Sequence, residues 1–252
     1  MNSIQVLGVR VDDVTMAEAL AQVDDWMQEP RLHHIVTVNP EFIVAAQKDA
    51  DFARTLAASD LNLPDGANLL RAAQAQGTPL RERVAGTDFV WYLCGVAAVC
   101  GWKVFLLGGR DGVGGLAAAR LQARYRKLKI VGTFEGSPDP AETSAILERI
   151  HESGADLLFV AYGAPAQDIW IERNRHNLPN VRVAIGVGGA FDFIAKRVRR
   201  APSWMQRLGL EWLFRLTIQP WRAKRQWALV VFVVKILRRG RWGAHKRPQV
   251  TS

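Results

Sequence analysis

The chain has 252 residues, of which 49% are hydrophobic and 23% are charged, and its net charge is +9. This length suits one large domain or one domain with an appendage, and the composition excludes an intrinsically disordered chain. Two cysteines are too few for a disulfide scaffold.

Short β-rich runs alternate with amphipathic stretches along most of the chain. The apolar run 89–102 is too short for a membrane span, so we expect a buried core helix there. Helices are also expected at 115–127, 141–152 and 167–177. This alternation predicts an α/β fold with a parallel sheet flanked by helices. The expected strands cover residues 33–38, 103–107, 129–134, 156–161 and 181–185.

Glycine pairs follow two of the expected strands, at the sheet edge where α/β proteins bind ligands. Backbone N–H groups at Gly108-Gly109 and Gly188-Gly189 would suit a diphosphate at a helix start, and the alternative is a tight turn. Neither loop has the Gly-x-Gly-x-x-Gly or P-loop pattern, which disfavours a dinucleotide or ATP site. Asp111, after the first pair, would either cap a helix or contact a ribose.

Four polar residues each allow a structural and a functional interpretation. Asp65 lies in a Pro-Asp-Gly turn and would be a helix N-cap or a general base at a strand end. Asn39 precedes a proline and is a good N-cap. Gln167 is a helix-start residue that would suit the surface, and Arg83 would be a solvated charge or an anion clamp. Taken singly, these residues favour the structural interpretation.

The sequence lacks the spacing of a metal site. His33 and His34 are adjacent on an expected strand and point to opposite faces, and the other three histidines add no ligand pattern. Asp49 and Asp51 have the Asp-x-Asp form of some metal-dependent glycosyltransferases, but they lie in a helical, Ala-rich stretch. We therefore expect neither a metal ion nor a cofactor.

The composition changes sharply near residue 196. Residues 196–252 hold 15 Lys and Arg and one acid, Glu211, for a net charge of +14, whereas residues 1–195 carry −5. The apolar run 227–237 is too short to span a bilayer. Basic residues, tryptophans and this run predict a helical amphipathic appendage on an anionic membrane surface, with nucleic acid as the alternative partner. The expected domains are therefore 1–195 and 196–252.

Several segments, in order, resemble the WecG/TagA/CpsF glycosyltransferases, and the resemblance covers residues 4 to about 226. It is clearest at 200–204, running into 209–213. It implies a Rossmann-like α/β enzyme that inverts configuration and needs no metal. Its members typically transfer N-acetylmannosamine, or its uronic acid, from UDP to N-acetylglucosamine on undecaprenyl diphosphate. The other matching segments are 37–41, 63–66, 83–88, 105–109, 163–170 and 186–192.

The resemblance also implies roles for individual residues. Asp65 would deprotonate the acceptor hydroxyl, and Arg83 would lie near the reacting groups. Three residues of the donor-sugar pocket would be Thr37, Asn39 and Gln167. The glycine loops and Asp192 would hold UDP, and arginines of the appendage would neutralise the diphosphate as the appendage closes over the site. The expected substrate-binding residues are Thr37, Asn39, Gly108, Gly109, Asp111, Tyr162, Gly163, Pro165, Gln167, Gly188, Gly189, Asp192, Arg215, Arg222 and Arg225.

Departures from the family pattern leave the transferred sugar open. Ala166 and Asp168 stand where Lys and Glu are common, and Lys196 replaces a usual glycine. Other members transfer hexoses for exopolysaccharides. The expected partners are a UDP-sugar, a polyprenyl-diphosphate-linked acceptor and the cytoplasmic face of the plasma membrane, with a homo-oligomer left open. The competing hypotheses are a noncatalytic membrane scaffold and a nucleic-acid-binding module.

Overall fold

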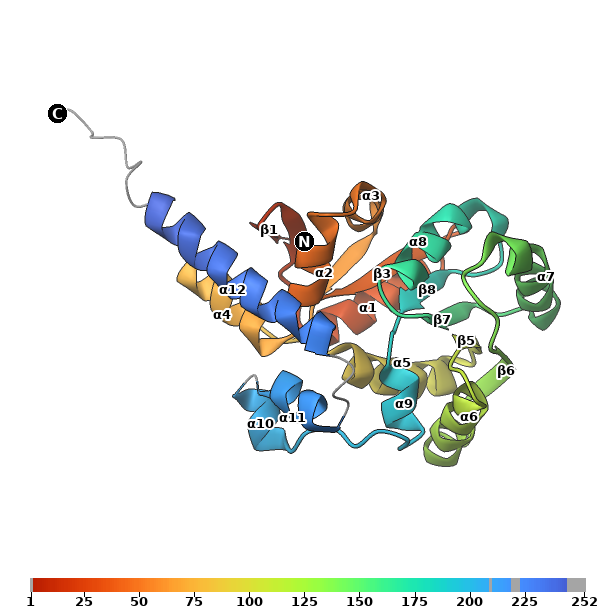
Figure 1. Ribbon diagram of the computed structural model, residues 1–252. Coiled ribbons are helices and arrows are strands. Elements are labelled where there is room, and N and C mark those ends of the chain that lie inside the picture. Colours follow the sequence, from red (N-terminus) through yellow and green to blue (C-terminus); the bar gives the residue numbers. More distant parts are fainter. Residues whose placement is uncertain (1, 209, 219–222, 244–252) are drawn as a thin grey trace.

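The computed structural model describes residues 2–208, 210–218 and 223–243 and has a mixed α/β architecture (Figure 1). The strands are β1 (Ser3–Val6), β2 (Val9–Asp12), β3 (His33–Val38), β4 (Leu61–Pro64), β5 (Lys103–Gly108), β6 (Lys129–Phe134), β7 (Leu157–Ala161) and β8 (Val183–Gly186). The α-helices are α1 (Met16–Trp26), α2 (Pro40–Ala46), α3 (Ala50–Ala58), α4 (Ala67–Ala75), α5 (Gly86–Cys100), α6 (Val113–Arg124), α7 (Thr143–Ser153), α8 (Ala166–Arg173), α9 (Ala190–Ile194), α10 (Ser203–Arg207), α11 (Glu211–Ile218) and α12 (Ala223–Gly243). Two 3₁₀ helices are η1 (Pro140–Glu142) and η2 (Arg175–Asn177).

Six strands form one parallel sheet in the order β4-β3-β8-β7-β5-β6. The predicted parallel α/β sheet is therefore confirmed, with its five expected strands at its centre and far edge. Strand β4 was not predicted, and neither was the separate antiparallel hairpin of β1 and β2.

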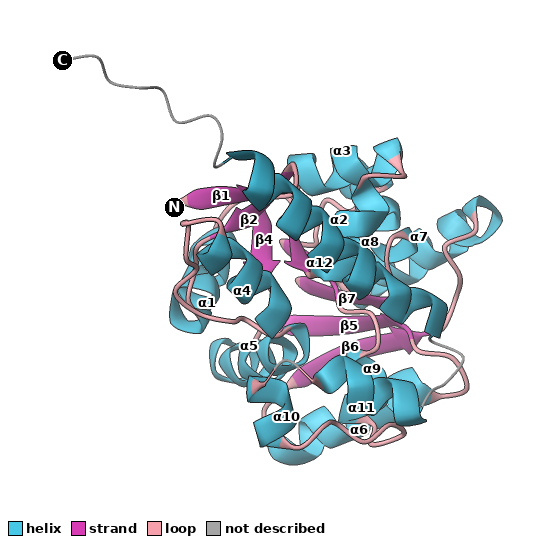
Figure 2. Ribbon diagram, turned by 60° about the vertical axis from the view of Figure 1, so that its left-hand side comes forward, coloured by secondary structure: helices cyan, strands magenta, loops and turns pink. Residues whose placement is uncertain are grey.

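Helices cover both faces of the sheet, which explains why every residue of β3 is buried (Figure 2). One face packs against α1, α5, α6 and α9 in a cluster centred on residues such as Phe89, Leu106 and Phe159. The other packs against α2 and α3 near β3, and against α7 and α8 near β7. The sheet is thus a rigid middle layer that fixes where its strand ends lie.

The carboxyl ends of β3 and β8 mark a topological switch point. These strands are neighbours, paired as far as Val36 opposite Gly186. Beyond them the chain enters α2 on one face of the sheet and α9 on the other. Diverging connections of this kind leave a crevice at the strand ends, which is where open α/β sheets bind ligands.

The C-terminal helices dock onto the body. Helix α12 lies along α2 and also contacts α4 and α11 (Figure 1). Its Phe232 is 1% exposed and its Ile236 8%, both within the core cluster of α2 and α3. On the outside of the same helix Trp227 is 66% exposed and Leu237 62%. None of the helices in the described part of the chain has an apolar stretch long enough to cross a bilayer.

Candidate active site

Two adjoining cavities open at the carboxyl ends of the strands. An inner cavity of about 120 Å³ occupies the β3–β8 crevice. An outer cavity of about 170 Å³ lies between the ends of β3 and β4 and the C-terminal helices. The inner cavity is lined by Thr37, Asn39, Glu41, Phe42, Asp65, Gly86, Thr87, Gly163, Ala164, Gln167, Val187, Gly188, Gly189 and Ala190. The outer cavity is lined by Asn39, Pro40, Glu41, Asp65, Gly66, Ala67, Asn68, Arg83, Ala85, Thr87, Phe193, Arg200, Gln206, Glu211, Trp212 and Leu229.

Asp65 lies on the wall that the two cavities share. Its backbone N–H donates to the Val38 carbonyl at 2.8 Å, so the β3–β4 ladder holds it at the strand end. Its carboxylate oxygen Oδ2 accepts the Gly86 N–H at 3.2 Å. Gly66, at φ +109°, turns the chain into α4 and is the N-cap of that helix. The N-cap interpretation of Asp65 is therefore wrong.

Arg83 bridges Asp65 and a second carboxylate, Glu211. Its Nε lies 3.7 Å from Asp65 Oδ1, and its Nη2 donates to Glu211 Oε2 at 3.0 Å. The interpretation of Arg83 as a solvated charge is therefore wrong. Glu211 was not predicted as a site residue, although it is the one acid in the basic C-terminal segment. A cation held between two carboxylates fixes the orientation of the Asp65 side chain in the shared wall.

Gln167 joins two loops at the base of the inner cavity. Its Oε1 accepts the N–H of Gly163 at 3.1 Å and the N–H of Gly188 at 2.8 Å. The side chain is 1% exposed, so the surface interpretation of Gln167 is wrong. Because the two loops follow β7 and β8, this carboxamide sets the spacing of the walls on that side of the cavity.

Thr37 and Asn39 form the opposite wall. Thr37 is buried at the end of β3, and its hydroxyl donates to the Gly186 carbonyl at 3.5 Å. A Cβ on Gly86 would lie 2.9 Å from the Thr37 methyl group, so only glycine lets α5 start this close. Asn39 caps α2 through its side-chain oxygen Oδ1, as predicted. Asn39 also lines both cavities.

Comparison with known proteins shows which family has this sequence pattern. The sequence model of the WecG/TagA/CpsF family of glycosyl transferases matches residues 4–247. The chain belongs to this family. It is also 36% identical over 204 residues to the N-acetylglucosaminyldiphosphoundecaprenol N-acetyl-beta-D-mannosaminyltransferase of Bacillus subtilis (strain 168). That alignment covers 81% of this chain and 78% of the relative. The resemblance inferred from the motifs is confirmed, and the protein is a glycosyltransferase.

Part of the expected binding set of the glycosyltransferase comes together at the crevice, and part lies elsewhere on the same sheet edge. Thr37, Asn39, Gly163, Gln167, Gly188 and Gly189 line the inner cavity. Within the described residues, neither cavity is lined by the β5–α6 loop with Gly108, Gly109 and Asp111, nor by Tyr162, Pro165 and Asp192.

The β5–α6 loop is a tight turn. A Cβ on Gly109 would lie 2.8 Å from the Gly114 nitrogen, and the φ of Gly109 is +80°. Asp111 is exposed, and the N-cap of α6 is Gly112, whose N–H donates to Glu135. The helix-cap interpretation of Asp111 is therefore wrong. Its role toward a ribose stays a prediction.

Tyr162 is partly buried and packs against the core cluster that includes residues of α7 and α8. Its ring meets Trp170 edge-on, with centroids 6.2 Å apart. Burial raises the pKa of the Tyr162 phenol well above its ordinary value. Its hydroxyl is buried and, among the described atoms, has no hydrogen-bond partner.

Of the expected arginines of the appendage, Arg222 lies outside the described residues, and the same holds for the side chains of Arg215 and Arg225. A further arginine, which sequence reasoning did not assign, lines the outer cavity. Arg200 donates to the Asp88 carboxylate through both terminal guanidinium nitrogens, with Nη2 2.8 Å from Oδ2. In the described part of the chain no three His, Cys, Asp or Glu residues gather as a metal site.

Proposed function

We propose that this glycosyltransferase transfers N-acetylmannosamine from UDP to N-acetylglucosamine on undecaprenyl diphosphate, for a cell-surface polysaccharide. The name of the Bacillus relative supports the acceptor and the sugar. The observation that carries the proposal is the position of Asp65 on the wall between two cavities. A base in that wall reaches a donor on one side and an acceptor on the other.

The proposed reaction is a single displacement with inversion. The donor lies in the inner cavity with its sugar against Thr37, Asn39 and Gln167, and the acceptor enters through the outer cavity. Asp65 takes the proton of the acceptor hydroxyl. The hydroxyl oxygen of the acceptor bonds to the anomeric carbon of the donor sugar as the bond from that carbon to UDP breaks. The new glycosidic bond therefore has the opposite anomeric configuration.

Departing UDP needs positive charge and hydrogen-bond donors, since charge develops on its diphosphate. We propose that arginines supply this charge without a metal ion: Arg83 near the reacting groups, and Arg215, Arg222 and Arg225 from the C-terminal segment. The remaining proposed contacts with UDP are Gly108, Gly109, Asp111, Tyr162, Gly163, Pro165, Gly188, Gly189 and Asp192.

A lipid-linked acceptor calls for a site next to a bilayer. Along α12 the exposed residues Trp227, Val230, Val234 and Leu237 follow a helical spacing of three and four, so they share one face. We propose that residues 196–252 form an appendage whose α12 face lies on the anionic cytoplasmic surface of the plasma membrane, and that residues 1–195 form the catalytic domain.

The catalytic proposal is tested with the full chain, a panel of UDP-sugars and a short-chain polyprenyl-diphosphate N-acetylglucosamine. We expect one sugar to be added from UDP-N-acetylmannosamine, with the anomeric configuration inverted relative to the donor by NMR. Transfer from a UDP-hexose instead would assign the chain to exopolysaccharide synthesis. UDP binding without any product would refute the proposed acceptor. The absence of UDP binding would refute the proposed donor.

The membrane proposal is tested by sedimentation with vesicles that contain or lack phosphatidylglycerol. We expect binding to anionic vesicles, and its loss in a Trp227→Ser/Leu237→Ser double variant. The matched control is Val99→Ser, because Val99 is an apolar residue on α5 that is 85% exposed. Equal binding by the double variant would refute the proposed surface.

A further inference from the structure

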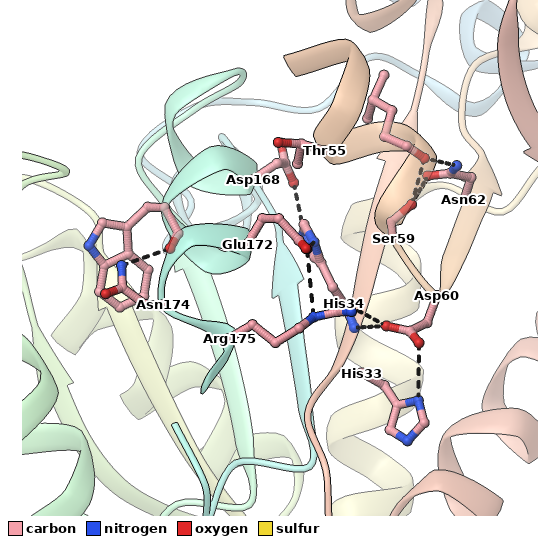
Figure 3. Close-up of polar contacts among 12 residues, drawn as sticks. His33, His34, Thr55, Ser59, Asp60, Asn62, Asp168, Glu172, Asn174 and Arg175 are labelled. Atoms are coloured by element: carbon pink, nitrogen blue, oxygen red, sulfur yellow. Dashed lines mark hydrogen bonds and ion pairs between the residues drawn. The ribbon is translucent and has the colours of Figure 1, made fainter. Parts of the chain in front are cut away.

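A charged network joins β3 and α8 (Figure 3). His34 and Asp168 are completely buried, and His34 Nε2 lies 3.6 Å from Asp168 Oδ1. On its other side, His34 Nδ1 lies 3.4 Å from Glu172 Oε2. Asp168 and Glu172 are four residues apart on α8, so both carboxylates face the same histidine. Buried charges are costly unless paired, so this arrangement calls for an explanation beyond packing.

Asp168 connects this network to the cavity wall through Gln167. The Gln167 Nε2 donates to Asp168 Oδ2 at 3.3 Å, while Oε1 accepts the two loop N–H groups described above. A carboxamide offers two donors at nitrogen and two lone pairs at oxygen. A carboxylate beside the NH₂ group therefore specifies which way the amide faces. The orientation that Asp168 favours is the one that holds the loops of Gly163 and Gly188.

The sheet is shaped to admit these two side chains. A Cβ on Gly186 would overlap Asp168 Oδ1 and would lie 2.5 Å from Gln167 Nε2. Gly186 is the last residue of β8, directly before the loop that lines the inner cavity. The absence of a side chain at this position lets the first turn of α8 reach the strand ends.

The charges around His34 favour its protonated form. Burial opposes the charge, but the contacts with Asp168 and Glu172 outweigh it and raise the pKa of His34 above its ordinary value. The contact with His34 in turn lowers the pKa of Glu172. The other charged groups at this face are Arg175, paired with Glu172, and Asp60, which accepts the His34 backbone N–H at 2.8 Å.

We propose that Asp168, held by His34, is a positioning residue that fixes the Gln167 carboxamide across the two loops and so shapes the donor side of the inner cavity. This inference rests on the proposed UDP-sugar donor. It assigns Asp168 and His34 to the support of donor binding, whereas a purely structural pair would contribute to stability alone.

The test compares three variants of the full chain by UDP affinity and by the KM for the donor. Asp168→Asn offers an NH₂ group as well as an oxygen, so it no longer specifies the orientation of Gln167. We expect its UDP Kd and donor KM to rise at least about tenfold, with a smaller change in kcat. Asp168→Glu keeps the carboxylate and should stay within about threefold of the wild type. The matched control is Glu172→Gln, since the described contacts of Glu172 are with His34 and Arg175.

Thermal unfolding of each variant separates binding from stability. The proposal is supported if Asp168→Asn weakens donor binding while Glu172→Gln lowers the melting temperature with the donor KM unchanged. It is overturned if Asp168→Asn melts earlier but binds UDP as the wild type does. If that variant does not fold, His34→Gln must raise the donor KM, and an unchanged KM overturns the proposal. Failure of the wild type to bind UDP at all would instead refute the proposed function, and this inference with it.

Discussion

The inner and outer cavities share a wall but differ in what holds them in shape. The inner cavity is built from strand ends and the loops that follow them, and its polar side chains are tied to backbone groups, as Gln167 is to Gly163 and Gly188. The outer cavity is closed by side chains from beyond residue 195, and ion pairs such as Arg83–Glu211 hold it. The shape of the inner cavity therefore follows from the sheet, and the shape of the outer cavity follows from the docking of the C-terminal helices.

This difference predicts that donor binding and sugar transfer are separable. A change confined to the C-terminal helices should leave the inner cavity intact and lower transfer. A change at the shared wall should abolish transfer while UDP still binds. Substitutions at the shared wall and in the C-terminal helices test this separation.

Asp65→Asn should lower kcat by about 10²–10⁴-fold, because it removes the proposed base and keeps the size of the side chain. The UDP Kd should change by no more than about twofold, since Asp65 is not among the proposed contacts with the nucleotide. Initial rates with a soluble short-chain acceptor and titration calorimetry with UDP measure the two effects. Asp51→Asn, at an exposed carboxylate on α3, is the matched control. Near-wild-type turnover would refute the assignment of the base.

Phe232→Asp should undock α12, because it places a charge in the core cluster shared with α2. We expect transfer to fall by about tenfold or more and the melting temperature to drop, while the KM for the intact UDP-sugar stays near the wild-type value, because the charge that the proposed arginines neutralise develops as UDP departs. Val233→Asp is the control, since Val233 is the exposed neighbour on the same helix. A parallel rise in the donor KM would show that the two cavities are not separable.

Glu211→Gln should lower kcat by about tenfold, because the hydrogen bond that anchors Arg83 loses its charged acceptor and is weakened. UDP affinity should again stay constant, since Glu211 lines the outer cavity. Steady-state kinetics with both substrates varied measures this. A rise in the donor KM alone would place Glu211 on the donor side and contradict the separation of donor binding from transfer.

The fold was largely predictable because β3, β5, β6, β7 and β8 each leave a local hydrophobic signal. The crevice was also predictable, since ligands bind at strand ends in parallel sheets. Local patterns failed where a residue's partner is distant in sequence. Arg83 pairs with Glu211 across 128 residues and Arg200 with Asp88 across 112, and no spacing rule reveals either pair.

Asp65 and Gln167 show why local interpretation of the site was ambiguous. Both stand at element boundaries, where polar residues usually cap helices or face water. Asp65 is instead held by the Gly86 N–H, and Gln167 is buried because Gly186 leaves it room. Family motifs identified both residues, but the structure supplies the physical reason for their positions.

The His34 network that supports the inner cavity should contribute a small stabilisation that depends on pH. Contacts with Asp168 and Glu172 raise the pKa of His34 in the folded state. The stabilisation from its charge is therefore complete below the unfolded pKa of about 6.5 and is lost as pH rises through the folded pKa. Wild type should exceed His34→Gln in unfolding free energy by on the order of 1 kcal/mol at pH 6, and the difference should shrink toward pH 9. Urea unfolding at both pH values measures it, and a difference that grows with pH would mean that His34 is buried neutral.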